Sequence, residues 1–339
     1  MAENVMEQIV SELKLNGNGF YPERGELKSV RVVGHTPKSD HYIYDIVIDF
    51  ADGSERLAAK VYRNGKCGIH GARGMAKIEA ANLHEAYASV QKKKLEGVPR
   101  PVGDFTEIGA VVAEKLNGLP LQSIIMKAAL LPGYADRGTL SVTAAQTGNW
   151  LRNFHRATSD GMQAFDTSAL LHDLEKLCDN CRGEGLDDNA VRTITSGARG
   201  ILARSKKQIP ISAILNDFTP LNVIVCENGV GISDYARMQR NGSSFQDVAL
   251  FMASVEALEK YPFCDRNITT QVQDEFLDAY GVAPAEQGVL RVLKMKALLG
   301  MFAQGRGVKE SAVRKKVMWA TVMKRFIQQV AQRSLAPAA

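Results

Sequence analysis

The chain has 339 residues, of which 45% are hydrophobic and 23% charged, and its net charge is +5. This composition excludes an intrinsically disordered chain, and the length is sufficient for the two lobes of one bilobal protein. The N-terminal segment carries Glu3, Glu7 and Glu12 rather than an uninterrupted apolar stretch, so it does not resemble a signal peptide. No apolar run approaches the roughly 20 residues of a membrane-spanning helix, and the five cysteines are most simply reduced thiols, so we expect a cytoplasmic protein without a transmembrane segment.

The first part of the chain predicts a helix followed by strands. Apolar residues at helical spacing predict a short helix over residues 4–15. Residues 28–34 and 41–50 are rich in β-branched and aromatic side chains, and Ala51-Asp52-Gly53 offers a tight turn into residues 55–63. We therefore expect three antiparallel strands in this region.

The rest of the chain predicts one more helix and a strand pair, followed beyond residue 116 by a series of helices. Strong helix formers predict a helix from Gly74 to near Gly97, and residues 103–116 predict a further strand pair. Beyond Asn117-Gly118 the spacing is helical, over residues 141–158, 168–182, 188–206, 245–260, 268–280, 286–303 and 309–333. The sequence thus predicts an α+β protein, with a small antiparallel β N-lobe at 1–116 and a larger, mainly helical C-lobe at 117–339.

Three polar residues in the second half of the chain stand at a spacing that suits phosphoryl transfer. Asp217 and Asn222 are five residues apart, and Asp234 follows after the apolar run 223–225. Phosphoryl transfer depends on cations that neutralise phosphate charge and on a carboxylate that orients the attacking hydroxyl. Asp217 can supply that carboxylate, while Asn222 and Asp234 offer oxygen ligands of the kind that Mg²⁺ prefers.

A cation and its partner are available upstream. Lys60 lies in the third predicted strand, from which it could reach the α- and β-phosphates of a nucleotide, and Glu79 on the next helix could hold its ammonium. Glu85, six residues away and so on a different face, is the competing acid on that helix.

Together these motifs resemble the aminoglycoside phosphotransferase and choline kinase group of the protein-kinase-like fold. Asp217, Asn222 and Asp234 match the group's H-G-D-x-x-x-x-N loop and the following I-D segment. Residues 150–155 are similar to its L-x-x-L-H helix, and residues 245–249 resemble its D-L-A segment, whose aspartate, here Asp247, supports the catalytic loop. The resemblance covers about residues 30–258.

The resemblance implies a nucleotide, a metal and a set of roles. It implies a protein-kinase-like bilobal fold and transfer of the γ-phosphate of ATP, with Mg²⁺, to a hydroxyl of a small molecule such as a sugar, amino sugar or amino alcohol. The residues it marks are Asp217 as the catalytic base, Asn222 and Asp234 as metal ligands, Lys60 and Glu79 at the phosphates, Glu114 to Leu116 as the hinge that binds adenine, and Ser39 as a ligand of the β-phosphate.

Two departures from the group's pattern keep an alternative open. Leu215 stands where the group has its loop histidine, and the phosphate-covering segment 34–41 has a single glycine and a proline. Both departures are compatible with a nucleotide-binding pseudokinase or scaffold that has little or no transfer activity. A protein kinase is disfavoured, because only thirteen residues separate Asp234 from Asp247, which leaves little room for a peptide-positioning segment.

The charge pattern leaves the acceptor and other partners open. Residues 160–188 hold eight acids and would suit a cationic acceptor, whereas residues 291–339 hold eleven Lys or Arg and one acid and would suit an anionic one. Solvated helix charge explains the basic C-terminus more simply than nucleic-acid binding does. We expect His155 to be a buried, hydrogen-bonded helix residue, and Cys178 and Cys181 to be two thiols on a helix rather than zinc ligands.

Overall fold

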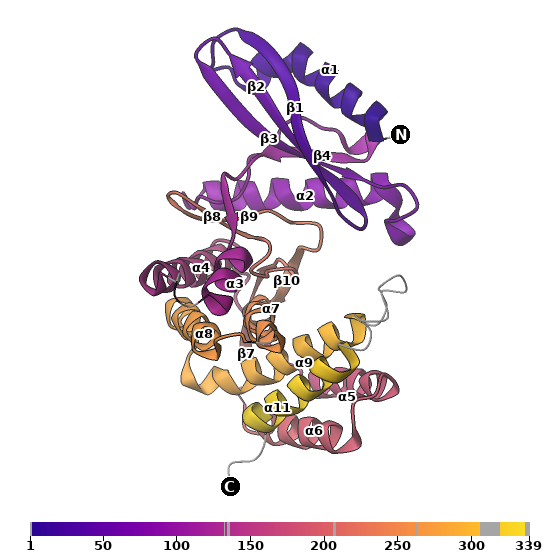
Figure 1. The fold of residues 1–339 in the computed structure, drawn as a ribbon, viewed down its shortest axis with the longest axis vertical. Coiled ribbons are helices and arrows are strands. Elements are labelled where there is room, and N and C mark those ends of the chain that lie inside the picture. Colours follow the sequence, from indigo (N-terminus) through magenta and orange to yellow (C-terminus); the bar gives the residue numbers. More distant parts are fainter. Residues whose placement is uncertain are drawn as a thin grey trace. The chain divides into compact units, whose positions relative to one another are not determined.

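A computed structural model of the chain describes residues 2–131, 133, 136–205, 208–261, 263–305 and 319–335. The chain forms two compact units (Figure 1). Unit 1 comprises residues 1–118 and 226–238, and unit 2 comprises residues 119–225 and 239–339. In the described ranges, no helix has the length and apolar character needed to cross a membrane.

Unit 1 is built on a four-stranded antiparallel sheet, β1 (Leu27–Pro37), β2 (His41–Phe50), β3 (Gly53–Tyr62) and β4 (Ala110–Glu114), in the order β1-β2-β3-β4. The predicted three-stranded meander is confirmed. Phe50 pairs with Gly53, so Ala51 and Asp52 form the predicted turn. Gly53 has a φ of +159°, a value at the edge of the region that favours glycine.

Two helices flank this sheet, α1 (Ala2–Phe20) and α2 (Gly71–Gln91). Alternate residues of β2 and β3, such as Ile46, Ile48 and Leu57, are fully buried in a core that also contains Ile9 and Leu13 of α1. One face of the sheet therefore packs on α1. Because side chains alternate along a strand, Lys60, between the buried Ala59 and Val61, points to the other face.

The strand pair predicted over residues 103–116 is wrong in its first half. That half forms a single helical turn at Thr106–Ile108, and only β4 is a strand. Gly103 and Gly109 have positive φ values of 68° and 78°, and Asp104 accepts hydrogen bonds from the backbone N–H and the hydroxyl of Thr106. These features favour a turn over an extended strand.

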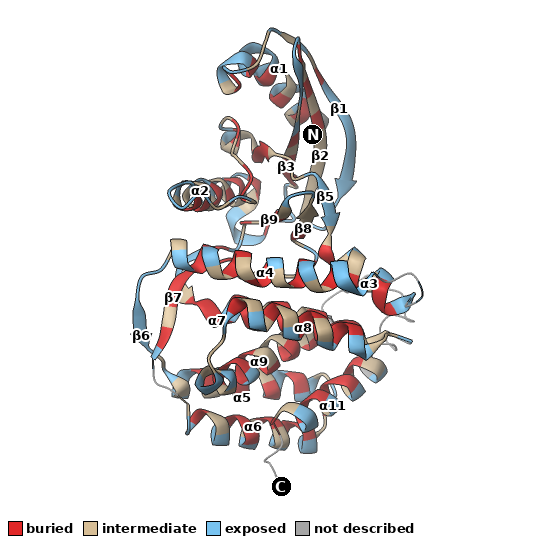
Figure 2. Ribbon diagram, turned by 90° about the vertical axis from the view of Figure 1, so that its left-hand side faces the viewer, coloured by how far each residue is buried: buried red, intermediate tan, exposed pale blue. Residues whose placement is uncertain are grey.

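Unit 2 is mainly helical, as predicted, and its helices stack in layers with their buried faces toward one another (Figure 2). They are α3 (Leu121–Leu130), α4 (Arg137–Ala157), α5 (Thr167–Gly183), α6 (Asp188–Leu202), α7 (Ser244–Glu256), α8 (Arg266–Tyr280), α9 (Gln287–Gly305) and α11 (Lys324–Leu335). A small antiparallel sheet orders the strands β10 (Gln239–Ser243), β7 (Gln208–Ile214) and β6 (Met162–Ala164). The strands β5 (Gly118–Pro120) and β8 (Val223–Cys226) include points at which the chain passes from one unit to the other, and β9 (Gly229–Ile232) follows in unit 1.

Helix boundaries show where side-chain caps override apolar spacing. α4 begins at Arg137 rather than near residue 141, because the Asp136 carboxylate accepts from the Thr139 N–H and caps the helix. α3 was not predicted. The helix predicted over residues 309–333 is described from residue 319 onward, as a π-helical turn at Trp319–Met323 followed by α11, and its earlier part lies outside the described residues.

Candidate functional site

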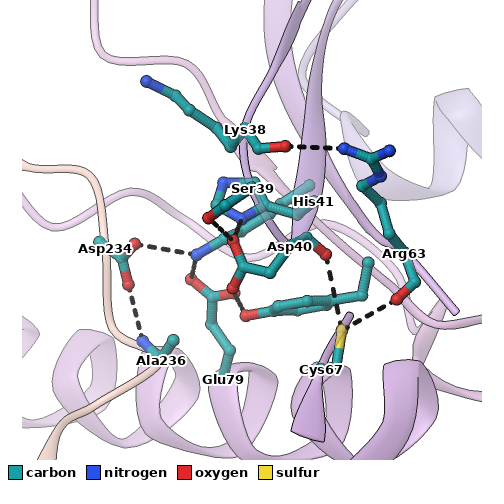
Figure 3. Close-up of polar contacts among 11 residues, drawn as sticks. Lys38, Ser39, Asp40, His41, Arg63, Cys67, Glu79, Asp234 and Ala236 are labelled. Atoms are coloured by element: carbon teal, nitrogen blue, oxygen red, sulfur yellow. Dashed lines mark hydrogen bonds and ion pairs between the residues drawn. The ribbon is translucent and has the colours of Figure 1, made fainter. Parts of the chain in front are cut away.

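Lys60 lies in a buried cluster of charges in unit 1. Its ammonium donates to Glu79 Oε1 at 2.9 Å and to Asp234 Oδ2 at 3.0 Å. Figure 3 shows Glu79 and Asp234, the two acceptors, close to each other. The Lys60 side chain is only 12% exposed. Burial opposes the charge of Lys60, but the two carboxylates outweigh burial and raise its pKa, so the ammonium stays protonated.

Helix α2 places Glu79 because its buried residues recur at helical spacing. Ala72, Ala76, Leu83 and Ala86 share the buried stripe with Glu79. The Tyr62 hydroxyl donates to Glu79 Oε2 at 2.6 Å, so both carboxylate oxygens have partners. Burial raises the pKa of Glu79, while Lys60 and Tyr62 oppose that rise.

The segment after β9 is tied to the same helix. Asp234 Oδ1 accepts from the Ala236 N–H at 2.9 Å, and Asn82 of α2 donates to the carbonyls of Tyr235 and Met238 at 2.9 and 3.1 Å. Burial raises the pKa of Asp234, but Lys60, the Ala236 N–H and His41 together outweigh burial and lower the pKa, so the carboxylate is ionised. Asn82 was missed from the sequence; its position three residues after Glu79, and so on the same helix face, is the signal that could have found it.

The predicted phosphate-covering segment forms the turn of the β1–β2 hairpin. Ser39 is exposed, and its hydroxyl donates to Asp40 Oδ1 at 3.2 Å. The same Asp40 oxygen lies 2.9 Å from His41 Nδ1, and the Arg63 guanidinium donates to the Lys38 carbonyl (Figure 3). Burial, followed by the Lys60 charge, lowers the pKa of His41 despite Asp40. The structure thus places a carboxylate beside Ser39, which the sequence analysis did not consider.

The predicted hinge begins at Glu114, the last residue of β4. The Glu114 N–H donates to the Arg100 carbonyl at 2.9 Å, and Glu114 Oε1 accepts from Arg100 Nε at 2.8 Å. The Leu116 side chain lies against Gly231 of β9, where a Cβ atom would approach Leu116 Cδ1 to 2.9 Å. Gly231 therefore permits this close packing.

In unit 2, the buried Asp247 holds the loop that precedes Asp217. Its two oxygens accept from the N–H groups of Leu215 and Asn216 at 2.7 and 2.8 Å. His155 Nε2 lies 3.2 Å from Asp247 Oδ2, and His155 Nδ1 lies 2.9 Å from the Tyr280 hydroxyl. The predicted support of the loop by Asp247 and the predicted buried, hydrogen-bonded state of His155 are both confirmed.

Asp217 and Asn222 meet in one compact loop. The Asn222 side-chain amide donates to the Asp217 carbonyl at 3.0 Å, so its amide oxygen is the atom that a metal would use. Phe218 is fully buried and packs against the rings of Trp150 and Phe251, with centroids 6.2 and 5.6 Å away. This anchor next to Asp217 was not recognised from the sequence.

The structure groups the predicted residues within each unit. Unit 1 brings Lys60, Glu79 and Asp234 together, and unit 2 brings Asp217 and Asn222 together. Ser39 and the residues Glu114 and Leu116 make separate contacts in unit 1.

The two cysteines of the CxxC motif both lie buried on α5, as predicted. Burial raises the pKa of Cys178 to about 12 and that of Cys181 to about 11.

Comparison with known proteins gives a result for the fold alone. No family model and no curated protein matches the sequence. Among solved structures, a choline kinase from Cryptosporidium parvum is 13% identical and superposes with a TM-score of 0.56 over 97% of this chain and 96% of its own. The ADP-bound aminoglycoside phosphotransferase APH(2'')-Ib is 13% identical, with a TM-score of 0.54 over 97% and 99%.

A third structure agrees. A fructosamine-3-kinase, described as putative, from Thermobifida fusca is 15% identical, with a TM-score of 0.52 over 96% of this chain and 99% of its own. Identities this low establish the fold but not the activity. The chain has the protein-kinase-like fold that the aminoglycoside phosphotransferase and choline kinase group adopts.

Proposed function

We propose that the protein is an ATP- and Mg²⁺-dependent phosphotransferase that moves the γ-phosphate to a hydroxyl of a sugar, amino sugar or amino alcohol. The observation that supports this most is the buried Lys60–Glu79–Asp234 cluster. Burial of an ammonium and two carboxylates costs desolvation free energy, and such clusters are found more often at functional sites than elsewhere. The APH(2'')-Ib structure with the same fold holds ADP.

The side chains present fit a nucleotide and a divalent cation. The Lys60 ammonium can bind phosphate oxygens, while Glu79 and Tyr62 keep its side chain in place. Asp234 offers a charged oxygen and Asn222 a neutral one, the donor set that Mg²⁺ prefers. A bound Mg²⁺ neutralises phosphate charge that would otherwise resist attack.

Asp217 is the proposed base. Its loop is fixed on both sides, by the N–H groups of Leu215 and Asn216 on Asp247 and by the buried Phe218 ring. These contacts do not use a side chain at position 215. Leu215 is therefore compatible with an ordered loop, and we propose that Asp217 orients the acceptor hydroxyl and takes its proton.

The acidic segment 160–188 gives little support to a specifically cationic acceptor. Most of its acids are engaged in unit 2, since four pair with basic side chains and two cap helices. The pairs are Asp173–Lys296, Glu175–Arg199, Asp179–Arg182 and Asp188–Arg182, and the caps are Asp166 and Asp187. Neutral sugars thus belong in the acceptor panel beside amino sugars and amino alcohols.

The test is ADP release over a panel of such acceptors, followed by Asp217→Asn. We expect turnover with the best acceptor to fall by roughly 10²- to 10⁴-fold, the size of a general-base contribution, with ATP affinity within about twofold. Asp136→Asn is the matched control, because Asn also caps helices and Asp136 is an exposed cap residue. Full turnover in Asp217→Asn would remove Asp217 from the mechanism.

A second candidate is a nucleotide-binding protein with little transfer activity. The observation that favours it is the Asp40 carboxylate beside Ser39 in the segment proposed to contact phosphates. It predicts thermal stabilisation by ATP, with and without Mg²⁺, and no ADP release with any acceptor. Release of ADP at enzymatic rates in the presence of any one acceptor would exclude this second candidate.

A further inference from the structure

Unit 1 contains a cavity that the proposed phosphotransfer does not use. Its volume is about 450 Å³, within the range of small-molecule sites. It is lined by the first turns of α1 and α2, the ends of β2 and β3, and residues 63–64. Val5, Val61 and Ile108 supply apolar surface, and Arg63 and Arg73 supply charge.

The two arginines of this cavity differ from the others in the same part of the chain. The other four arginines in residues 1–118 each form an ion pair: Arg24–Glu55, Arg31–Asp49, Arg56–Asp45 and Arg100–Glu114. Within the described ranges, neither Arg63 nor Arg73 pairs with a carboxylate, and none of the described residues lining the cavity is acidic. The cavity is therefore positively charged and supplies no counter-ion of its own.

Two contacts hold the Arg63 guanidinium in place. It lies over the Tyr42 ring, 5.0 Å from the centroid. One of its nitrogens donates to the Lys38 carbonyl at 3.1 Å, as Figure 3 shows. Less side-chain entropy is lost when a group ordered in this way binds a ligand. Arg73 lies in the first turn of α2, which has no acidic residue and no side-chain cap, so the helix dipole adds to the positive potential there.

We propose that this cavity binds a small organic anion, a phosphate or carboxylate group on an apolar body. The anionic group pairs with Arg63 and Arg73, since a guanidinium matches either group with two donors. The apolar body lies on Val5, Val61 and Ile108.

The site is separate from the Lys60 cluster, although one residue belongs to both. Tyr62 lines the cavity and donates its hydroxyl to Glu79. An anionic probe could also bind at the Lys60 ammonium, so the experiment must separate the two positions. Binding is measured directly, which makes the result independent of whether the protein transfers phosphate.

The experiment is calorimetric titration of the full chain with phenyl phosphate, phenylacetate and neutral benzyl alcohol. We expect saturable binding of one molecule of at least one anion, and at least tenfold weaker binding of the alcohol. The two anions distinguish a phosphate ligand from a carboxylate ligand. Absence of saturable binding of both anions, or equal binding of the alcohol, overturns the proposal.

Three variants test whether the anion binds in the cavity. Arg73→Gln should weaken anion binding roughly ten- to a hundredfold, the worth of a charged hydrogen bond. Gln8→Trp should weaken it by filling the cavity from α1, where Gln8 is exposed. Lys77→Gln on the same helix is the matched control, because neither Lys77 nor its ion-pair partner Glu107 lines the cavity, and it should leave binding within twofold.

Two results would contradict this placement. Anion binding by Arg73→Gln that equals the wild type would show that the arginine does not contribute. Complete displacement of the anion by saturating ATP would place it at the Lys60 ammonium instead.

Discussion

Each unit buries one carboxylate beside a predicted functional loop, and the two are held in different ways. Glu79 in unit 1 pairs with the ammonium of Lys60, whose side chain is 12% exposed. Asp247 in unit 2 is fully buried and is occupied by two backbone N–H groups and a histidine. The Lys60 cluster joins charged side chains to one another, whereas the Asp247 cluster holds the backbone in place.

This difference separates two kinds of mutational effect. Loss of Asp247 should act on stability, because its partners are two backbone N–H groups and a buried histidine that hold the loop in place. Loss of Lys60 should act on ligand binding, and its cost in stability should depend on the carboxylates left behind.

The largest expected effect is on the unfolding of Asp247→Ala. Removal of a buried carboxylate that accepts three hydrogen bonds should lower the free energy of unfolding by about 3–5 kcal/mol, measured by urea denaturation. Asp136→Ala removes an exposed helix cap in the same unit and should cost about 1 kcal/mol. Equal losses in the two variants would contradict the role assigned to Asp247.

The next effect concerns Lys60. Lys60→Met should lower the free energy of unfolding by about 2–3 kcal/mol, because Glu79 and Asp234 then face each other unpaired. The double variant Lys60→Met/Glu79→Gln removes one of those charges and should recover about 1–2 kcal/mol, while ATP binding stays at least about tenfold weaker in both. Recovery of ATP binding in the double variant would show that Lys60 has no direct role in it.

A smaller effect is expected from Asn82→Ala. The variant loses hydrogen bonds to the carbonyls of Tyr235 and Met238, which should cost about 1–2 kcal/mol of unfolding free energy. Because the same segment contains Asp234, we also expect a higher Mg²⁺ concentration for half-maximal activity. Gln91→Ala, at an exposed position of the same helix, is the control, and an unchanged Mg²⁺ requirement in Asn82→Ala would contradict this coupling.

The smallest expected effect is the response of the Lys60 cluster to alkaline pH. A lysine whose folded-state pKa is raised contributes stability that is fully present below its ordinary value of 10.5 and is lost as the pH rises through the raised value. The difference in unfolding free energy between wild type and Lys60→Met should therefore be the same at pH 7 and pH 10, within about 0.5 kcal/mol. A marked decrease at pH 10 would show that the carboxylates do not hold the ammonium as described.

Local spacing together with the family resemblance was sufficient to predict the contact of Lys60 with Glu79. Strand alternation places Lys60 on the face opposite Ala59 and Val61, and helix periodicity places Glu79 on the buried stripe of α2. The same reasoning predicted two strands within residues 103–116, which was wrong because positive φ values at Gly103 and Gly109 depend on packing rather than on apolar pattern.

The sequence by itself determined the strand meander of unit 1, the helical character of unit 2 and the residue types able to bind phosphate and metal, because these follow from short-range periodicity and side-chain chemistry. Only the tertiary structure decided which atoms of distant residues meet: the Asp234 carboxylate with the Lys60 ammonium, 174 residues apart, and the Asp247 carboxylate with the N–H of Leu215, 32 residues apart. The physical reason is that a buried polar group needs a hydrogen-bond partner, and the fold rather than the local sequence determines which groups are close enough to serve. Arg63 and Arg73, which pair with no carboxylate among the described residues, are a further example, since only the fold shows that they share a cavity.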